Sequence, residues 1–129
     1  MENHPYKEAY RYVDNAKTLL GEKAKKNNGI YQDEKYVRMA GDTAWKGVLI
    51  AVTYWLKAKK IEFNKNNRPD VDWYIMEISK INMKLKENFR SAYNILHKSM
   101  GYDGEKRATI VSEGINLSLE VISSCEGDS

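Results

Sequence analysis

The sequence predicts an all-α fold, a mostly antiparallel four-helix bundle, built as a single domain over residues 1–129. Apolar residues recur at spacings of three and four along four long stretches, which is typical of helices that bury one face. Three turn-forming clusters, KKNNGIYQD, FNKNNRPD and MGYDG, separate these stretches, and only two prolines occur, Pro5 and Pro69. No strand pattern, repeat or low-complexity tract is apparent, so we expect no sheet.

The first helix is expected over residues 6–26 and the second over residues 33–63. The apolar positions of the first are Ala9, Tyr12, Val13, Ala16, Leu19 and Leu20. Those of the second are Tyr36, Val37, Ala40, Ala44, Val48, Ala51, Val52 and Trp55. The second helix also carries small residues, which would let a neighbouring helix approach closely, although Gly41 and Gly47 are equally consistent with a bend.

The third helix is expected over residues 71–99, with Asp70 or Asp72 capping its first backbone amides. Its apolar positions are Ile75, Ile78, Ile81, Leu85, Phe89, Ala92 and Leu96. The fourth helix, over residues 105–125, should close the bundle. Its apolar positions are Ala108, Val111, Ile115, Leu119 and Ile122.

Composition and charge restrict the class of protein. The charged fraction of 30% is mixed in sign, and a net charge of +3 does not by itself imply binding to nucleic acid. The single cysteine, Cys125, excludes an intrachain disulfide and a cysteine-based zinc site. The N-terminus lacks a signal-peptide pattern, and the longest apolar stretch, GVLIAVTYWL, is too short to span a bilayer as an isolated helix. We therefore expect a cytoplasmic protein that does not interact with membranes.

Most cofactor and metal chemistry has no motif here. The paired Glu-x-x-His motifs of di-metal bundles are absent, and there are only two histidines, His4 and His97. The sequence also lacks a Walker loop, a dinucleotide-binding glycine pattern and a Gly-x-Ser-x-Gly elbow. Cys125 has no neighbours that would lower the pKa of its thiol. We expect no cofactor and no bound metal.

A cluster of basic residues lies toward the end of the expected second helix and in the turn that follows it. Its members are Lys57, Lys59, Lys60, Lys65 and Arg68. Cations near a helix C-terminus complement the helix dipole, which accounts for basic residues at this place. We prefer this interpretation of the cluster over a nucleic-acid site, because the net charge of the chain is small.

The candidate functional residues are Arg90, Asn94 and His97, all on the expected third helix. Seven residues of α-helix turn through about 700° and advance about 10 Å, so Arg90 and His97 should share one face, with Asn94 between them. This polar stripe should point away from the apolar stripe of the same helix. It is either a solvated surface or half of a site that a second molecule completes across a two-fold axis.

The helix order, the stretch KYVRMAGDTAWKGVLIAVTYWL, and Arg-x6-His followed by GYDG and a last amphipathic helix resemble HEPN-like helical bundles. The chain looks closest to a small bacterial branch of uncharacterised members. In HEPN ribonucleases an arginine and a histidine separated by four to six residues form an active site at a dimer interface, and Arg90 and His97 fit the upper limit of that spacing. The resemblance implies that Arg90 would bind phosphate, His97 would act as acid and base, and Asn94 would orient the substrate or the histidine. Ser91 departs from the Asn, Asp or His that usually follows the arginine.

Many HEPN-like proteins are non-catalytic partners, some of them paired with a small nucleotidyltransferase. The preferred interpretation is a non-catalytic accessory or binding module, forming a homodimer and contacting a protein partner such as a small nucleotidyltransferase. The alternative is a metal-independent endoribonuclease, in which case RNA would be the substrate. Aromatic residues expected to be exposed outside the core stripe, such as Trp73 and Tyr93, favour the dimer, because aromatic residues are enriched in interface cores.

Overall fold

A computed structural model describes residues 4–64 and 69–128 of the chain. The elements are α1 (Pro5–Glu22), β1 (Lys26–Asn27), β2 (Ile30–Tyr31), α2 (Glu34–Ala58), α3 (Val71–Ser79), α4 (Met83–Ala92), the π-helix η1 (Tyr93–Tyr102) and α5 (Ala108–Gly127). Helices account for 76% of the structure, which confirms the all-α class.

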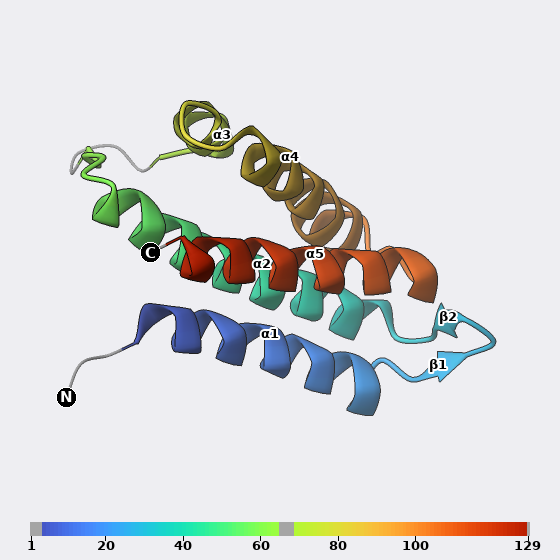
Figure 1. The fold of residues 1–129 in the computed structure, drawn as a ribbon. Helices are drawn as coiled ribbons and strands as arrows, with labels where there is room; N and C mark the ends of the chain where they lie inside the picture. Colours follow the sequence, from blue (N-terminus) through green and yellow to red (C-terminus); the bar gives the residue numbers. More distant parts are fainter. Residues whose placement is uncertain (1–3, 65–68, 129) are drawn as a thin grey trace.

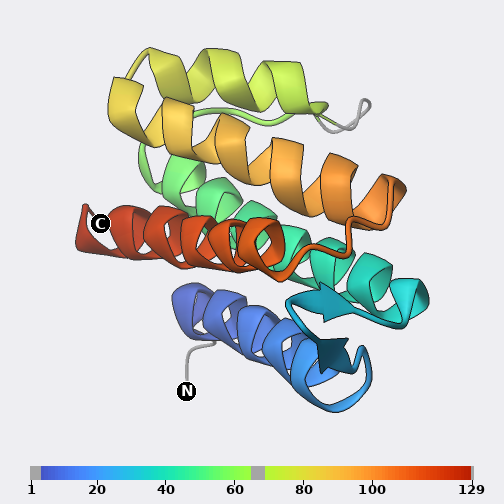
Figure 2. The same cartoon turned by 90° about the vertical axis from the view of Figure 1, so that its right-hand side faces the viewer.

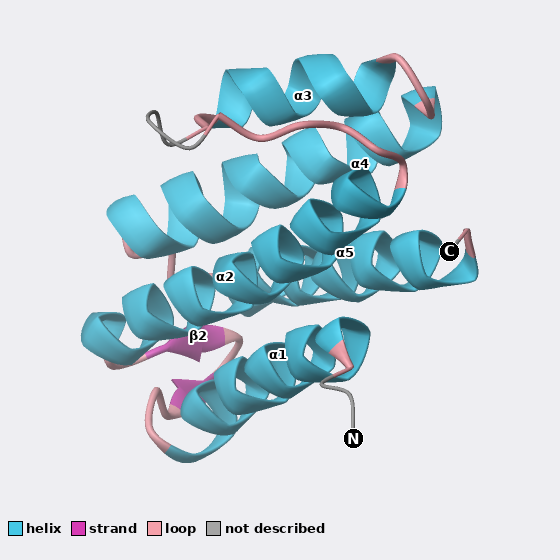
Figure 3. Cartoon of the chain, turned by 90° about the vertical axis from the view of Figure 1, so that its left-hand side faces the viewer, coloured by secondary structure: helices cyan, strands magenta, loops and turns pink. Residues whose placement is uncertain are grey.

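The long helix α2 lies at the centre of the molecule. It packs against α1, α5 and η1, and α5 also contacts α1 and α4 (Figure 1). Viewed from the side, α1 forms one outer layer, α2 and α5 the middle, and α4 with η1 the next layer (Figure 2). The short helix α3 lies outermost and packs on α4 (Figure 3). Four long helical segments, counting α4 with η1 as one, therefore surround a common core.

A two-stranded hairpin joins α1 to α2, so the expectation of no strand is wrong. Lys26 pairs with Tyr31 and Asn27 with Ile30, and the connecting Asn28 and Gly29 have φ angles of 53° and 79°. Asn-Gly readily adopts the positive φ values that a type I′ hairpin turn requires. Because the hairpin takes these residues, α1 ends at Glu22 and not at residue 26.

The hairpin also fixes the start of α5. The Tyr31 amide donates to the Lys106 carbonyl and the Ala108 amide to the Gly29 carbonyl, both at 2.8 Å. Arg107 thus has extended backbone beside Ile30, and α5 begins at Ala108 instead of the expected residue 105.

The second helix starts where the sequence predicts, with the Asp33 carboxylate accepting a hydrogen bond from the Lys35 amide at 3.2 Å. It ends at Ala58, five residues earlier than expected. Lys60 has a φ of 69°, and the Ile61 amide donates to the Leu56 carbonyl, the pattern of a left-handed helix end. Two residues of the predicted basic patch, Lys65 and Arg68, lie outside the described residues.

The expected third helix is not continuous. Asp70 caps α3 as predicted, accepting from the Trp73 amide at 2.9 Å, but Asn82 has φ −151° and ψ 105° and cannot continue the helix. Its side chain accepts from the Leu85 amide at 2.9 Å and starts α4. The apolar spacing runs on across the break through Ile78 and Leu85, which explains why periodicity alone misses it.

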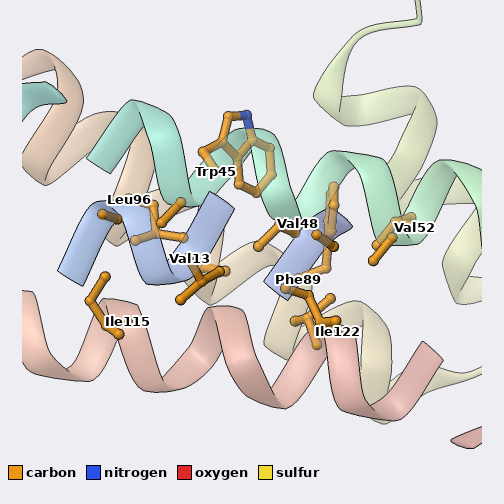
Figure 4. Close-up of a cluster of buried hydrophobic side chains, with 14 of the residues drawn as sticks. Val13, Trp45, Val48, Val52, Phe89, Leu96, Ile115 and Ile122 are labelled. Carbon is orange, nitrogen blue, oxygen red and sulfur yellow. The ribbon is translucent and has the colours of Figure 1, made fainter. Parts of the chain in front are cut away.

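The core is formed by side chains from α1, α2, α3, α4, η1 and α5. Figure 4 labels Val13, Trp45, Val48, Val52, Phe89, Leu96, Ile115 and Ile122 among them. Most positions that the apolar spacing marks as core are buried in the structure. In the part of the chain that the structure describes, no helix combines the length and apolar character needed to cross a bilayer.

Candidate functional site

The three residues that the sequence predicts for the site lie on two kinds of helix. Arg90 is in the last turn of α4, whereas Asn94 and His97 are in η1, and all three are exposed. Among the described residues, no hydrogen bond or ion pair joins any two of the three. The charge of Arg90 acts instead on Glu87, whose pKa is lowered mainly by a hydrogen bond from Lys86 and to a smaller degree by Arg90.

The π-helix changes the geometry of the predicted stripe. A π-helix closes its hydrogen bonds over five residues, as seen where the Asp103 amide donates to the Lys98 carbonyl at 2.9 Å. Its turns therefore hold more residues than those of an α-helix. Tyr93 and His97, four residues apart, stack with ring centroids 5.3 Å apart and planes inclined by 21°. The rotation calculated for a continuous α-helix does not apply to His97.

His97 lies against α2. Its ring centroid is 6.3 Å from that of Trp45, and its Nδ1 is 4.0 Å from an Oδ1 of Asp42. About half of the His97 side chain (49%) remains exposed. Tyr93 also packs on Trp45, with ring centroids 5.4 Å apart, so this aromatic residue is already in contact within its own chain. The same holds for Trp73, which packs on Phe63.

Sequence motifs alone do not point to Asp42, which is the carboxylate next to His97. It lies directly above Gly101, where a Cβ would come within 2.3 Å of the Asp42 Oδ1. At the residue before Asp42, a Cβ on Gly41 would meet the Leu96 carbonyl oxygen at 2.5 Å. Gly41 therefore lets α2 approach the backbone of η1, and Gly101 leaves room for the Asp42 carboxylate. The run of small residues in the second helix was the signal for this approach, and Asp42 is the acidic residue inside that run.

A second contact holds the far end of η1. The Arg38 guanidinium donates to the Tyr102 carbonyl and to the Glu34 carboxylate, the latter at 2.5 Å. The hydrogen bond from Arg38 is also the main reason that the pKa of Glu34 is lowered. Glu34 lies over Gly104, which has a φ of 69° and would clash if it carried a Cβ. Position and orientation of η1 are thus fixed from α2 at both ends.

The chemistry of this arrangement is that of an imidazole with a neighbouring carboxylate, which is suited to proton transfer. The carboxylate is largely exposed (61%), so the pair is in contact with water and not enclosed. Three surface hollows are lined by residues of α5, by the end of α2 with the following loop, and by the outer face of α2. Neither Arg90 nor His97 lines any of these three.

Two other kinds of site find no support in the described part of the chain. Cys125 is buried, and burial raises the pKa of its thiol to about 12, which makes it a poor nucleophile. Over residues 4–64 and 69–128, no three His, Cys, Asp or Glu side chains are grouped so that they could hold a metal ion.

The comparisons with known proteins give a family and a structural relative. Residues 4–127 match the family model described as Domain of unknown function (DUF5618). A solved structure described as a protein of unknown function from Dyadobacter fermentans superposes with a TM-score of 0.89 at 38% sequence identity. The match covers 97% of this chain and 96% of that one. No curated protein matches the chain.

Proposed function

The chain belongs to the DUF5618 family, and within it we propose that this protein is a non-catalytic accessory or binding module with a HEPN-like four-helix bundle. It acts as a homodimer in a bacterial cytoplasm and contacts a protein partner, such as a small nucleotidyltransferase. The bundle is supported by the four long helical segments that surround the core.

The observation that carries this proposal is the placement of Arg90 and His97. An RNA-cleaving site needs both groups on one phosphodiester, with the arginine able to stabilise the charge that develops there. Here His97 packs beside Tyr93, Trp45 and Asp42, and among the described residues no hydrogen bond or ion pair joins it to Arg90. The surface that remains is one for recognition rather than reaction.

A homodimer is supported by apolar side chains at the turn from α3 to α4. Met76, Ile81 and Met83 are exposed by 50%, 40% and 58% although all three are large and apolar. Exposed apolar side chains grouped at one place are typical of interaction sites. Light scattering at micromolar concentration should give the mass of two chains for the native protein, and a smaller mass for Met83→Glu. A native mass of one chain would exclude the dimer.

A metal-independent endoribonuclease remains the second candidate, because of one contact. Asp42 lies 4.0 Å from the Nδ1 of His97 and could orient the imidazole as an acid or base, and about half of the His97 side chain (49%) is exposed. In a dimer, Arg90 of the partner subunit would supply the phosphate-binding group, and Asn94 would orient the substrate.

The experiment is cleavage of a mixed set of labelled RNAs in the presence of a chelator. The native protein is compared with Arg90→Ala, His97→Ala and Asp42→Asn, and with His4→Ala as a matched control for loss of a histidine. The binding-module proposal expects no cleavage by any of the five proteins. Cleavage by native protein and His4→Ala, lost in Arg90→Ala and His97→Ala, would instead establish the ribonuclease.

A further inference from the structure

The outer face of α2 carries a shallow hollow of about 360 Å³, here called the α2 groove. It is lined by Lys46, Leu49, Ile50, Thr53, Tyr54 and Lys57. The six residues recur at spacings of three and four, so they form one continuous strip along the helix. Leu49, Ile50 and Thr53 are half-buried, and Tyr54 is 43% exposed.

The floor of the α2 groove is held from both sides. The Tyr54 ring meets the buried ring of Tyr6 edge to face, with centroids 5.3 Å apart. On the other side, the Thr53 hydroxyl forms a 2.7 Å hydrogen bond with the Tyr74 hydroxyl of α3. A surface fixed by α1 and α3 costs little to order when a ligand binds, which favours affinity.

The two ends of the α2 groove are positively charged. Lys46 and Lys57 are exposed and are separated by about 16 Å along the helix, at 1.5 Å per residue. Within the described part of the chain, neither ammonium group is paired with a carboxylate, although other cations of the same helix are paired, such as Arg38 with Glu34 and Lys59 with Asp128. The Lys57 ammonium lies 5.4 Å from the centre of the Phe63 ring.

The positive charge continues past the groove. A neighbouring hollow shares Lys57 and adds Lys60, with Ile61 and Phe63 as its apolar part. Glu62 is the acidic residue that lines it. The whole strip is therefore apolar along its length and predominantly basic at its edges.

We propose that the α2 groove binds an acidic amphipathic helix of a partner protein. Such a helix would place its apolar stripe on Leu49, Ile50 and Tyr54 and a carboxylate near each lysine. Acidic residues eleven positions apart on the partner helix match the separation of Lys46 and Lys57, because both helices rise by the same amount per residue. This inference rests on the proposed role as a binding module and specifies the chemistry of its partner.

The apolar floor decides against nucleic acid and membrane as occupants. A nucleic-acid site of this length would need further cations for the phosphates and exposed aromatic faces for the bases, and the groove offers two lysines and the edge-packed Tyr54. A membrane site would need apolar side chains that protrude, whereas Leu49 and Ile50 of the groove are half-buried.

The test is fluorescence anisotropy with a labelled synthetic helix of about 18 residues. It has leucines at helical spacing and two glutamates eleven residues apart, and a second peptide has lysines in place of the glutamates. The acidic peptide should bind the native protein, with at least about tenfold weaker binding for the double variant Lys46→Glu/Lys57→Glu. The lysine peptide should show the opposite preference.

A control variant makes the same change of charge elsewhere. Lys17→Glu/Lys84→Glu alters exposed lysines of α1 and α4 and should bind the acidic peptide within about twofold of the native protein. Circular dichroism of each variant establishes that it is folded. Equal binding of both peptides, or equal weakening by both double variants, would overturn the proposal.

Other occupants would also show themselves. Three other occupants are tested in the same way: a second copy of the chain, an oligouridylate, and vesicles of phosphatidylserine and phosphatidylcholine. The proposal would be overturned in favour of one of them if native protein bound that occupant but not the acidic peptide, and if Lys46→Glu/Lys57→Glu lost that binding. Cleavage of RNA by the native protein alongside peptide binding would refute the non-catalytic role and leave the groove proposal intact.

Discussion

Gly41→Ala tests the close contact between α2 and η1. A methyl group at this position would lie 2.5 Å from the Leu96 carbonyl oxygen, 2.6 Å from the Met100 Cβ and 3.0 Å from the Gly101 amide nitrogen. All three atoms belong to the backbone or to its first side-chain atom, so none can move away by rotating a side chain. The two helices would have to separate.

The expected cost is the difference between two effects. Overpacking of a core contact costs about 1–3 kcal/mol, and contact with backbone at three atoms puts Gly41→Ala toward the upper part of that range. Replacing glycine by alanine inside a helix returns up to about 1 kcal/mol. We expect the free energy of unfolding to fall by about 1–2 kcal/mol. For 129 residues, each kcal/mol corresponds to about 4 °C, so Tm should fall by about 4–8 °C.

Urea and thermal unfolding followed by circular dichroism measure this effect. Gly21→Ala is the matched control, because a Cβ at Gly21 would meet nothing within 4 Å in the structure. That variant should gain up to about 1 kcal/mol, since alanine is the better helix former. If Gly41→Ala were as stable as Gly21→Ala, the contact between α2 and η1 would not be as close as the structure has it.

Three further predictions concern ionisable groups. The pKa of Glu105 is lowered to about 2, mainly by a hydrogen bond from the Arg107 side chain. In Arg107→Ala, NMR should show this pKa rising toward 4.5, but not fully, because the backbone amide of residue 107 still donates to the carboxylate. The pKa of Glu105 is lower in the folded than in the unfolded chain, so its contribution to stability is present above about pH 4.5 and is lost as the pH falls toward 2. If the free energy of unfolding fell with acid in the same way in Arg107→Ala as in native protein, this reasoning would be contradicted. Cys125 should react with a thiol reagent at pH 8 only as fast as the protein opens, and rapid labelling of native protein would show that it is not buried. Asp128→Asn should lower the thermal midpoint slightly at low salt, where Asp128 pairs with Lys59 at 2.9 Å, and the difference from native should shrink in 1 M NaCl.

The helical class and most of the core could be predicted because they depend on local spacing. Val13, Val48 and Phe89 lie at positions where apolar residues recur every three or four residues, and each is fully buried. The cap at Asp70 is also a local feature, since a short acidic side chain before an apolar run can reach the first free amides.

The break at Asn82 and the hairpin could not be found in this way. Apolar residues remain in helical register across Asn82, so periodicity gives no sign of the change, although asparagine is a good N-cap. The hairpin is only two residues per strand, and its Asn-Gly turn was interpreted as an ordinary loop between helices.

For the candidate site, the exposure of Arg90, Asn94 and His97 could be predicted from sequence, because the three residues fall outside the apolar stripe of their helix. The meeting of His97 with Asp42 and Trp45 of another helix could not be predicted in this way. That contact lies between α2 and a π-helical segment, where Gly41 lets the helix approach the η1 backbone and Gly101 leaves room for the Asp42 carboxylate. A pattern along one helix carries no information about such an approach, because its cause is the shape of a surface more than fifty residues away in the chain.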